Sequence, residues 1–424
     1  MLDYQLTSFN NGLKLITAPL ANTRAVTVLF LVGVGSRFEK ENLGGISHFL
    51  EHLVFKGTKK RPTNLDIAKA LDAVGASYNA FTSEEYTGFF VRASSGHFDL
   101  ALDILFDILY QSKFDQREIE KEKGVIVEEI NLYQDTPTNF IVDVAKKLFY
   151  GDQPLGRPVT GQKETIKSFR QEDFLRYRDQ FYTPDNLIVA IAGGQNSINW
   201  QDKVHHFFDR VSLKKQGDYL PIKEAQLRPQ VLIHHKKTDQ AHLILGFRTL
   251  PRTDKRRPIL RVLNNLLGEN MSSRLFSEVR ERRGLAYYIS SEMADFRDCG
   301  ALGVSAGVDL GRVPEAIEVI LKEFNQLKNK PIAEEELTRA KENLKGKLYL
   351  GLEESFSVAD FLAEQVLFWD KIEDPDELVK KYEQVTPKDI QSLAQDFLVA
   401  KNLNLAMIGP FKDSVSFEKI LNNF

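Results

Sequence analysis

The chain contains a single cysteine, Cys299, among its 424 residues, so neither an internal disulfide nor a cysteine-rich zinc site is possible. It also has no excess of either charge, because 56 basic and 59 acidic residues leave a net charge of −3. This balance gives no reason to expect nucleic acid or an anionic membrane surface as a partner. We expect Cys299 to act as a small apolar residue.

Long apolar runs are also missing, and none approaches the length of a membrane span. The first residues, MLDYQLTSFNNG, contain neither a basic segment followed by an apolar one nor an arginine-rich amphipathic presequence. We therefore expect no membrane partner, and the simplest location is the cytoplasm of a prokaryote.

The most informative motif is H-x-x-E-H, which runs from His48 to His52 inside an apolar-periodic stretch, Ile46 to Phe55. On a helix, positions i and i+4 lie on one face with i+3 beside them, so both imidazoles point to one place next to Glu51. Two neutral imidazoles are good zinc ligands, and a carboxylate that does not bind the metal can accept a proton from water. A half-buried cluster of this kind would be costly without a metal or partners, which favours a zinc site over an ordinary pair of surface histidines.

A catalytic zinc needs a third protein ligand. The acid-rich helical stretch from Asp115 to Gln134 offers Glu118, Glu122 and Glu129, which recur on one face of a helix. Glu128 points about 100° away from Glu129. Most carboxylates in such a stretch are solvated, and the pattern leaves Glu122, Glu128 and Glu129 open as candidates.

Seven segments in succession extend this evidence over nearly the whole chain. They are GGISHFLEHLVFKGT (44–58), NAFTSEEYTGF (79–89), EIEKEKGVIVEEI (118–130), PLGRPVTG (154–161), FYTPDNLIVAIAG (181–193), MSSRLFSEVRERRGLAYYISS (271–291) and EEELTRAKENLKG (334–346). In these segments the chain resembles the M16 metallopeptidases, the family of pitrilysin, insulin-degrading enzyme and the mitochondrial processing peptidase. In particular, it resembles the shorter, bacterial branch of that family, whose members are like the processing peptidase.

The resemblance implies a role for each residue of the metal site. Glu129 matches the third ligand, which with His48 and His52 would hold one Zn²⁺ per chain. Glu122 matches a carboxylate that orients a ligand histidine. Glu51 matches the general base, which takes a proton from the attacking water and passes it to the leaving amine.

The resemblance also implies catalytic residues outside the metal site. Arg280 and Tyr287 match a pair that holds substrate carbonyls and stabilises the oxyanion. Tyr288 is easily confused with Tyr287, but the spacing from Arg280 fits Tyr287. The nearby stretch Gly268-Glu269-Asn270 is poorer in glycine than its counterpart in relatives.

The remaining substrate-binding residues form one short strand. Asn79, Ala80, Phe81 and Thr82 match the edge strand on which relatives lay the substrate backbone as an added strand. Backbone pairing of this kind selects an extended conformation rather than particular side chains, which suits a peptidase that acts on unfolded peptides. Without the resemblance, the same stretch is an ordinary edge strand.

An internal repeat indicates two related domains. The segment 172–193 reappears as 388–409, with six identical residues always 216 positions apart. Adding that offset to His48, His52 and Glu129 gives Asn264, Gly268 and Lys345, so the second half has no metal triad. We expect an N-terminal domain over 1–211 with the zinc site, a linker over 212–230, and a C-terminal domain over 231–424 with the Arg280 and Tyr287 pair.

The expected fold class is α+β. Hairpin signals such as Asn11-Gly12, without regular alternation of strands and helices, favour a mainly antiparallel sheet backed by helices in each domain. The resemblance adds that the two domains form half of a clamshell.

These features together predict a zinc-dependent endopeptidase that hydrolyses oligopeptides or unfolded segments in an enclosed chamber. Alternatives are a catalytically idle scaffold or partner subunit and a maturase dedicated to one peptide. Idle relatives usually lose metal ligands or the motif glutamate, whereas this chain keeps them. Large single-chain relatives enclose their chamber with four repeat units and this chain has two, so we expect a homodimer in which each zinc faces Arg280 and Tyr287 of the partner chain.

Overall fold

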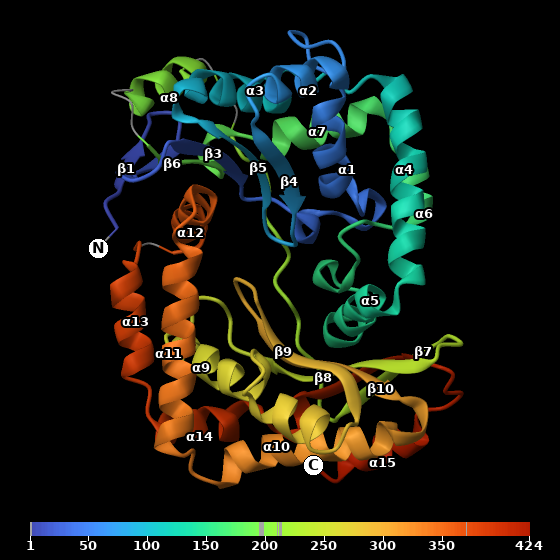
Figure 1. Cartoon of the computed structure of the whole chain (residues 1–424). Helices are drawn as coiled ribbons and strands as arrows, with labels where there is room; N and C mark the ends of the chain where they lie inside the picture. The colour runs from blue at the N-terminus through green and yellow to red at the C-terminus, as the bar shows by residue number, and fades with distance from the viewer. Residues whose placement is uncertain (1, 195–198, 210, 212–213, 370) are drawn as a thin grey trace. The chain divides into compact units, whose positions relative to one another are not determined.

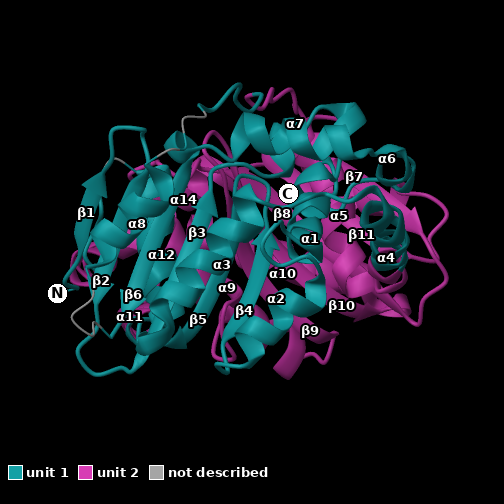
Figure 2. Cartoon of the chain, turned by 90° about the horizontal axis from the view of Figure 1, so that it is seen from above, with its two compact units in different colours: residues 1–131, 157–220, 349–374 teal, residues 132–156, 221–348, 375–424 magenta. Residues whose placement is uncertain are grey.

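The computed structural model describes residues 2–194, 199–209, 211, 214–369 and 371–424, and these form two compact units (Figure 2). Unit 1 comprises Met1–Asn131, Arg157–Leu220 and Tyr349–Asp374. Unit 2 comprises Leu132–Gly156, Pro221–Leu348 and Pro375–Phe424. No helix in the described ranges is both long enough and apolar enough to cross a bilayer.

Unit 1 is built on a six-stranded sheet in the order β1-β2-β6-β3-β5-β4. Its strands are β1 (Gln5–Ser8), β2 (Lys14–Pro19), β3 (Ala25–Val32), β4 (Ser77–Thr82), β5 (Thr87–Ser94) and β6 (Leu187–Gly193). All neighbours are antiparallel except β2 and β6. The predicted hairpin at Asn11-Gly12 joins β1 to β2, and Gly12 has a φ of 91°, which suits glycine at a tight turn.

Helices cover both faces of this sheet because its central strand, β3, is apolar on both sides. Val28 and Phe30 of β3 belong to the core under helices α1 and α3, whereas Leu29 and Leu31 pack with helix α12 (Figure 1). The helices of unit 1 are α1 (Ile46–Leu53), α2 (Asn64–Asp72), α3 (Phe98–Tyr110), most of α4 (Gln116–Asp135), α6 (Lys163–Ser168), α7 (Gln171–Phe181), α8 (Trp200–Phe208) and α12 (Ser355–Phe368).

Unit 2 repeats this topology with a five-stranded sheet in the order β7-β11-β8-β10-β9. Its strands are β7 (Gln230–His235), β8 (Gln240–Thr249), β9 (Ala286–Asp295), β10 (Gly300–Asp309) and β11 (Leu403–Gly409). The parallel pair of unit 1 aligns Lys14 with Ile188, and that of unit 2 aligns Gln230 with Asn404, each 216 residues later. The internal repeat in the sequence therefore corresponds to a repeated sheet.

The helices of unit 2 also cover both faces of their sheet. They are α5 (Pro137–Tyr150), α9 (Arg257–Gly268), α10 (Val313–Asn329), most of α11 (Glu334–Gly351), α13 (Pro375–Glu383), α14 (Pro387–Phe397) and α15 (Val415–Asn422). Leu243 and Leu245 of β8 lie in the core formed with α9, α10 and α14. Ile244 of β8 packs on the other face, with Ile141 and Ala145 of α5.

The expected α+β class with two similar, mainly antiparallel domains is confirmed, but the compact units differ from the sequence ranges 1–211 and 231–424. Helix α5 comes from the first half of the sequence and lies in unit 2, whereas α12 comes from the second half and lies in unit 1. Each helix covers an apolar sheet face, and hydrophobic patterning cannot say which of two similar sheets it covers. Of the expected linker, residues 212 and 213 lie outside the described residues.

Candidate metal centre

The helix that carries the H-x-x-E-H motif, α1, is fixed at its first residues. Its N-cap, Gly45, adopts a left-handed φ of 93° and a Cβ there would lie 2.8 Å from Gly161 Cα, so only glycine fits. Because glycine has no side chain to cap the helix, the buried carboxylate of Glu39 does so. It accepts hydrogen bonds from Gly45 N at 2.7 Å and from Ser47 N at 2.8 Å. These contacts fix the N-terminal end of α1 in unit 1, just ahead of His48, Glu51 and His52.

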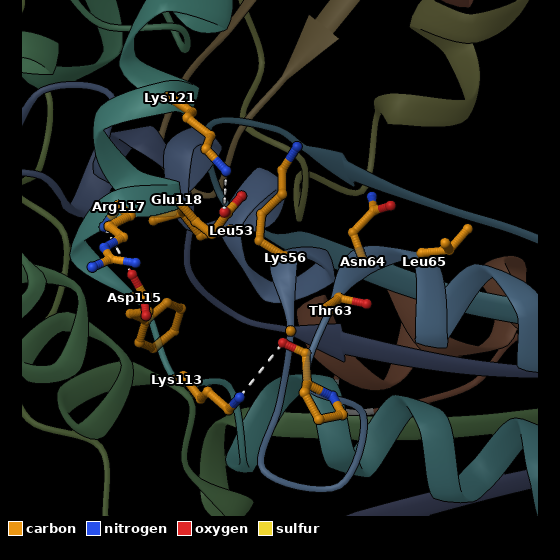
Figure 3. A pocket seen from close by; sticks show the side chains of 13 residues that line it. Leu53, Lys56, Thr63, Asn64, Leu65, Lys113, Asp115, Arg117, Glu118 and Lys121 are labelled. Carbon is orange, nitrogen blue, oxygen red and sulfur yellow. Dashed lines mark hydrogen bonds and ion pairs between the residues drawn. The ribbon is translucent and has the colours of Figure 1, made fainter.

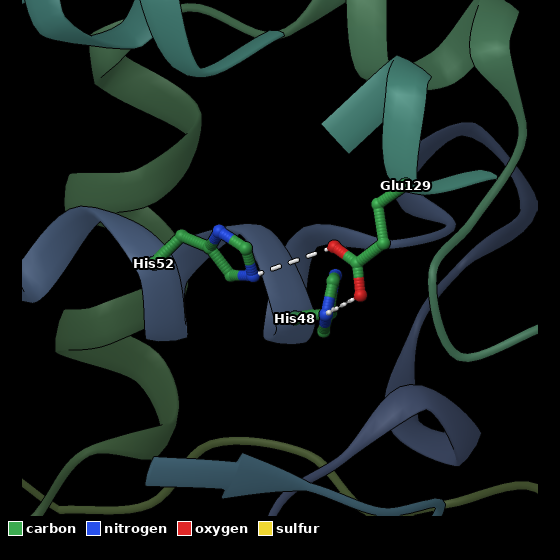
Figure 4. Close-up of side chains that lie close together, drawn as sticks. All are labelled: His48, His52 and Glu129. Carbon is green, nitrogen blue, oxygen red and sulfur yellow. Dashed lines mark ion pairs between the residues drawn. The ribbon is translucent and has the colours of Figure 1, made fainter. Parts of the chain in front are cut away.

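Three potential metal ligands converge from two helices. His48 and His52 lie one turn apart on α1, and Glu129 points toward both of them from α4 (Figure 4). His48 Nε2 lies 3.6 Å from Glu129 Oε1, and His52 Nε2 lies 3.6 Å from Glu129 Oε2. Among the described residues, this is the group of histidine, cysteine and acidic side chains whose ligand atoms come close enough to share one ion.

The spacing of these atoms suits zinc better than direct hydrogen bonding. A separation of 3.6 Å is too long for a hydrogen bond. It is close to the roughly 3.3 Å between two ligands of one tetrahedral zinc with bonds of about 2.0–2.1 Å. Two imidazoles and one carboxylate are also a donor set of catalytic zinc sites. The residues present therefore fit a zinc ion.

The three glutamates that the sequence left open occupy different places. Glu129 faces the Nε2 atoms of both histidines. Buried Glu122 lies on the other side of His52, with Oε1 2.9 Å from Nδ1. Glu128 is exposed and does not belong to the group.

Sequence reasoning missed one residue of this cluster, Lys56. Its Nζ lies 2.7 Å from Glu122 Oε2, so one buried carboxylate bridges Lys56 and His52. The signal was present, because Lys56 follows His52 by four residues, the spacing that brings side chains together on a helix. The arrangement favours His52 with its proton on Nδ1 and a free lone pair on Nε2.

The pKa values of the two histidines in the cluster are shifted in opposite directions. Burial, together with the neighbouring His52, lowers the pKa of His48 to about 3, so His48 is neutral at neutral pH. Burial also acts against a charge on His52, but the hydrogen bond to Glu122 and the nearby carboxylates raise the pKa of His52. Burial raises the pKa of Glu129, whereas for Glu122 the bonds to His52 and Lys56 outweigh burial and lower its pKa.

Glu51 lies next to this group, close enough to interact electrostatically with His52 and Glu129, and burial raises its pKa. Its Oε2 accepts a hydrogen bond of 2.5 Å from Thr82 Oγ1. The donor belongs to β4, the strand that was expected to receive substrate.

The predicted substrate strand lies at the edge of its sheet. Strand β4 is the last in the order and, among the described strands, pairs only with β5. Tyr78 and Ala80 pack into the core on the α1 side of the sheet, whereas Phe81 packs on the α12 side. Asn79 is exposed, and its Oδ1 accepts from Ala80 N at 2.9 Å.

Arg280 and Tyr287 lie in unit 2, both at irregular backbone. Arg280 is exposed in a π-helical turn, Phe276–Glu281, with its guanidinium carbon 4.8 Å from the centre of the Phe276 ring. Tyr287 is the extra residue of a β-bulge on the edge strand β9, since Ala286 pairs with Val308 and Tyr288 pairs with Gly307. π-turns and bulges occur often at functional sites.

The bulge separates the roles of the two adjacent tyrosines. Tyr287 is 76% exposed. Tyr288 instead lies against Gly307, where a Cβ would come within 2.4 Å of its ring, and its hydroxyl lies 3.0 Å from His242 Nδ1. Of the two side chains, that of Tyr287 is the one available to a ligand.

The positions of unit 2 that correspond to the metal site hold a hydrogen-bond network. Asn264 Nδ2 donates to Glu269 Oε1 at 2.7 Å, and Asn265 Nδ2 donates to Glu269 Oε2 at 3.0 Å. Gly268 packs closely on β9, because a Cβ there would lie 2.6 Å from Ser291 N. The stretch Gly268-Glu269-Asn270 is therefore held by specific contacts.

A pocket of about 510 Å³ lies at the C-terminal end of α1 (Figure 3). Its lining includes Lys56, Lys113, Arg117 and Lys121, of which Lys121 pairs with Glu118. Lys56 thus lines the pocket and also contacts Glu122.

The chain is similar to known proteins in both of its halves. Residues 14–163 match the family model described as insulinase, peptidase family M16, and residues 168–344 match the model described as the peptidase M16 inactive domain. An uncharacterized zinc protease of Streptomyces coelicolor is 36% identical over 96% of this chain and 90% of its own length. An uncharacterized zinc protease of Bacillus subtilis is 36% identical over 94% of this chain and 97% of its own length.

Solved structures share the fold of the whole chain. A protease from Helicobacter pylori superimposes with a TM-score of 0.91 at 24% identity, covering 97% of this chain and 100% of that one. A peptidase M16 inactive domain from Pseudomonas fluorescens gives a TM-score of 0.89 at 16% identity, covering 97% and 98%. With both halves matched by its family models and similar bacterial zinc proteases over nearly the full length, the chain belongs to peptidase family M16.

Proposed function

We propose that this protein is a zinc-dependent endopeptidase that hydrolyses oligopeptides or unfolded polypeptide segments. The observation that carries the proposal is the convergence of His48, His52 and Glu129 with Glu51 beside them. A ligand set without an adjacent base would suit a structural metal, and a carboxylate without the ligand set would have no activated water to deprotonate.

The proposed mechanism assigns one task to each side chain. His48, His52 and Glu129 would hold one zinc ion per chain, which supplies Lewis acidity that lowers the pKa of water and polarises a carbonyl group. Glu51 accepts a proton from the attacking water and donates it to the nitrogen of the leaving amine as the peptide C–N bond breaks. Glu122 keeps the Nδ1–H of His52 in place.

The substrate class follows from the exposed edge of β4. A peptide that pairs with the backbone of Asn79, Ala80, Phe81 and Thr82 must be extended, so folded proteins would be poor substrates. Arg280 and Tyr287 are proposed to donate hydrogen bonds to the substrate carbonyl and to the oxyanion that develops from it.

We further propose a homodimer that encloses the substrate in a chamber. One chain carries the metal group in unit 1 and the Arg280 and Tyr287 pair in unit 2, so two identical copies supply complete sites without a different partner. Each metal group would then act with Arg280 and Tyr287 of the other copy. The proposed compartment is the cytoplasm, in keeping with a sequence that contains only one cysteine, Cys299.

The test combines metal analysis with cleavage of an unstructured peptide library, with and without a chelator. We expect about one zinc per chain, cleavage that chelation abolishes, and cleavage of many peptides. The matched variant Glu51→Gln should keep its zinc and lose about 10²–10⁴-fold of the turnover. Zinc-loaded protein that cleaves nothing would support an idle subunit instead, and cleavage of one peptide alone would support a dedicated maturase.

A further inference from the structure

We propose that Thr82 is a positioning residue, which holds the carboxylate of Glu51 by Oε2 and so leaves Oε1 to exchange the proton during peptide hydrolysis. The inference rests on the proposed function and extends it to a residue that we had expected only to bind substrate. It starts from the 2.5 Å hydrogen bond between Thr82 Oγ1 and Glu51 Oε2.

The direction of the Thr82 side chain follows from strand alternation. Side chains two residues apart on a strand point to the same face, and Tyr78 and Ala80 face the core on the α1 side. Thr82 is next in that series and so reaches α1, whereas Phe81 packs on the opposite face. A shift of the strand by one residue would remove the bond.

The backbone that carries Thr82 is held on both sides. Thr82 pairs with Thr87 of β5, and the Thr87 hydroxyl donates to Val34 O at 2.8 Å. The following residue, Ser83, accepts from Ser36 N at 3.2 Å through its carbonyl. Gly35 makes this approach possible, because a Cβ there would lie 2.1 Å from Ser83 O. The hydroxyl therefore projects from a fixed point.

A fixed donor matters because Glu51 has three rotatable side-chain bonds. One strong hydrogen bond to an ionised oxygen selects a single orientation of the carboxylate and leaves the lone pairs of the other oxygen free. Since the Thr82 hydroxyl is committed to Glu51, we infer that β4 offers a peptide its backbone and not this side chain.

The same strand thus serves two purposes. If a peptide pairs along Asn79 to Phe81, its register relative to Glu51 is set through the one strand that also holds the base. The position of a bound peptide and the orientation of the Glu51 carboxylate are therefore linked, because Thr82 directly follows the residues that pair with the peptide.

Two near-isosteric variants test the hydroxyl. Thr82→Val keeps the shape and removes the donor, whereas Thr82→Ser keeps the donor and removes the methyl group. We expect Thr82→Val to lower kcat about 10-fold or more with little change in KM, and Thr82→Ser to stay within about threefold of wild type. Ser77→Ala, on the exposed start of the same strand, is the control and should behave as wild type.

Zinc content and the denaturant midpoint are measured on every variant, because a merely structural role would change these and would not distinguish valine from serine. A double mutant with Glu51→Gln provides the decisive comparison. If Thr82 acts through Glu51, adding Thr82→Val to Glu51→Gln should lower the residual rate no further.

The outcomes distinguish a failure of the proposed role of Thr82 from a failure of the proposed peptidase function. If Glu51→Gln is inactive but Thr82→Val matches wild type, or if the two effects multiply, the positioning role of Thr82 is wrong and the proposed function stands. If Glu51→Gln cleaves as fast as wild type, the proposed function itself fails.

Discussion

Replacing Glu122 with glutamine is a sharp test of the metal cluster, because this carboxylate serves two partners with two oxygens. Its Oε1 lies 2.9 Å from His52 Nδ1 and its Oε2 lies 2.7 Å from Lys56 Nζ. An amide has only one acceptor oxygen, so Glu122→Gln cannot satisfy both donors. If the amide keeps its oxygen on His52, its NH₂ group faces the ammonium of Lys56. If it turns over, the NH₂ group faces Nδ1 and favours the His52 tautomer whose Nε2 carries the proton and cannot bind zinc.

The expected loss in zinc affinity is about 10- to 100-fold, the usual effect of removing a partner that orients a ligand histidine. This corresponds to about 1.4–2.8 kcal/mol of binding free energy. The matched control is Glu118→Gln, one turn earlier on α4, where the carboxylate pairs with Lys121 and not with a histidine. Its zinc affinity should be unchanged.

The structure also predicts a rescue. Lys56→Met removes the cation that competes for the amide oxygen, so in the double variant the glutamine is free to accept from His52. Zinc affinity of the double variant, Glu122→Gln with Lys56→Met, should be about tenfold higher than that of Glu122→Gln alone, a gain of about 1.4 kcal/mol in binding free energy. Lys56→Met alone leaves both oxygens of Glu122 in place and should affect zinc less than Glu122→Gln does.

The assay is competition for zinc against a chelator of known affinity, which reads the site without reference to catalysis. Circular dichroism of each variant without metal controls for folding. Wild-type affinity in Glu122→Gln would refute the orienting role of Glu122. A double variant no better than Glu122→Gln would refute the competition between Lys56 and His52.

Three further predictions concern the ligand, the assembly and pH. Glu129→Ala should lose zinc by metal analysis, and full occupancy in that variant would exclude Glu129 as a ligand. Mixing and re-equilibrating the inactive variants Glu51→Gln and Tyr287→Phe should restore cleavage if sites form between copies; a mixture as inactive as its parents, or a monomer in solution scattering, would contradict the homodimer. Burial raises the pKa of Asp360 from 3.8 to about 7, so the folded protein holds a proton that the unfolded chain has lost, and stability falls as pH rises between these values. Asp360→Asn should abolish this loss of folding free energy, which is at most about 4 kcal/mol above pH 7. The measurement is the free energy of unfolding from denaturant titrations at several pH values, and the same pH slope for wild type and Asp360→Asn would contradict the raised pKa of Asp360.

Features that depend on neighbours along the chain could be predicted from the sequence. The spacing of His48, Glu51 and His52 places them together on any helix, because helix geometry is local. The Asn11-Gly12 turn is likewise local, and the repeat is found by comparing one stretch of sequence with another 216 residues later; both correspond to structure. The same offset, added to His48, leads to Asn264, whose Nδ2 donates to Glu269 Oε1.

Features that depend on how elements pack could not be predicted in this way. The pattern along α4 presents several glutamates, and only its packing beside α1 directs Glu129 to the Nε2 atoms and Glu122 to Nδ1 of His52. The bond from Thr82 to Glu51 spans 31 residues and depends on the register of an edge strand. Neither contact leaves a periodic signal.

The exchange of helices between the units has the same origin. α5 and α12 each present an apolar face, and each half of the sequence contains a sheet that such a face could cover. Hydrophobic burial is non-directional, so composition and period determine that these helices must be buried but not which sheet buries them. That choice is made by the path of the chain through α4 and α11, which each pass from one unit to the other, and it exists only once the tertiary structure has formed.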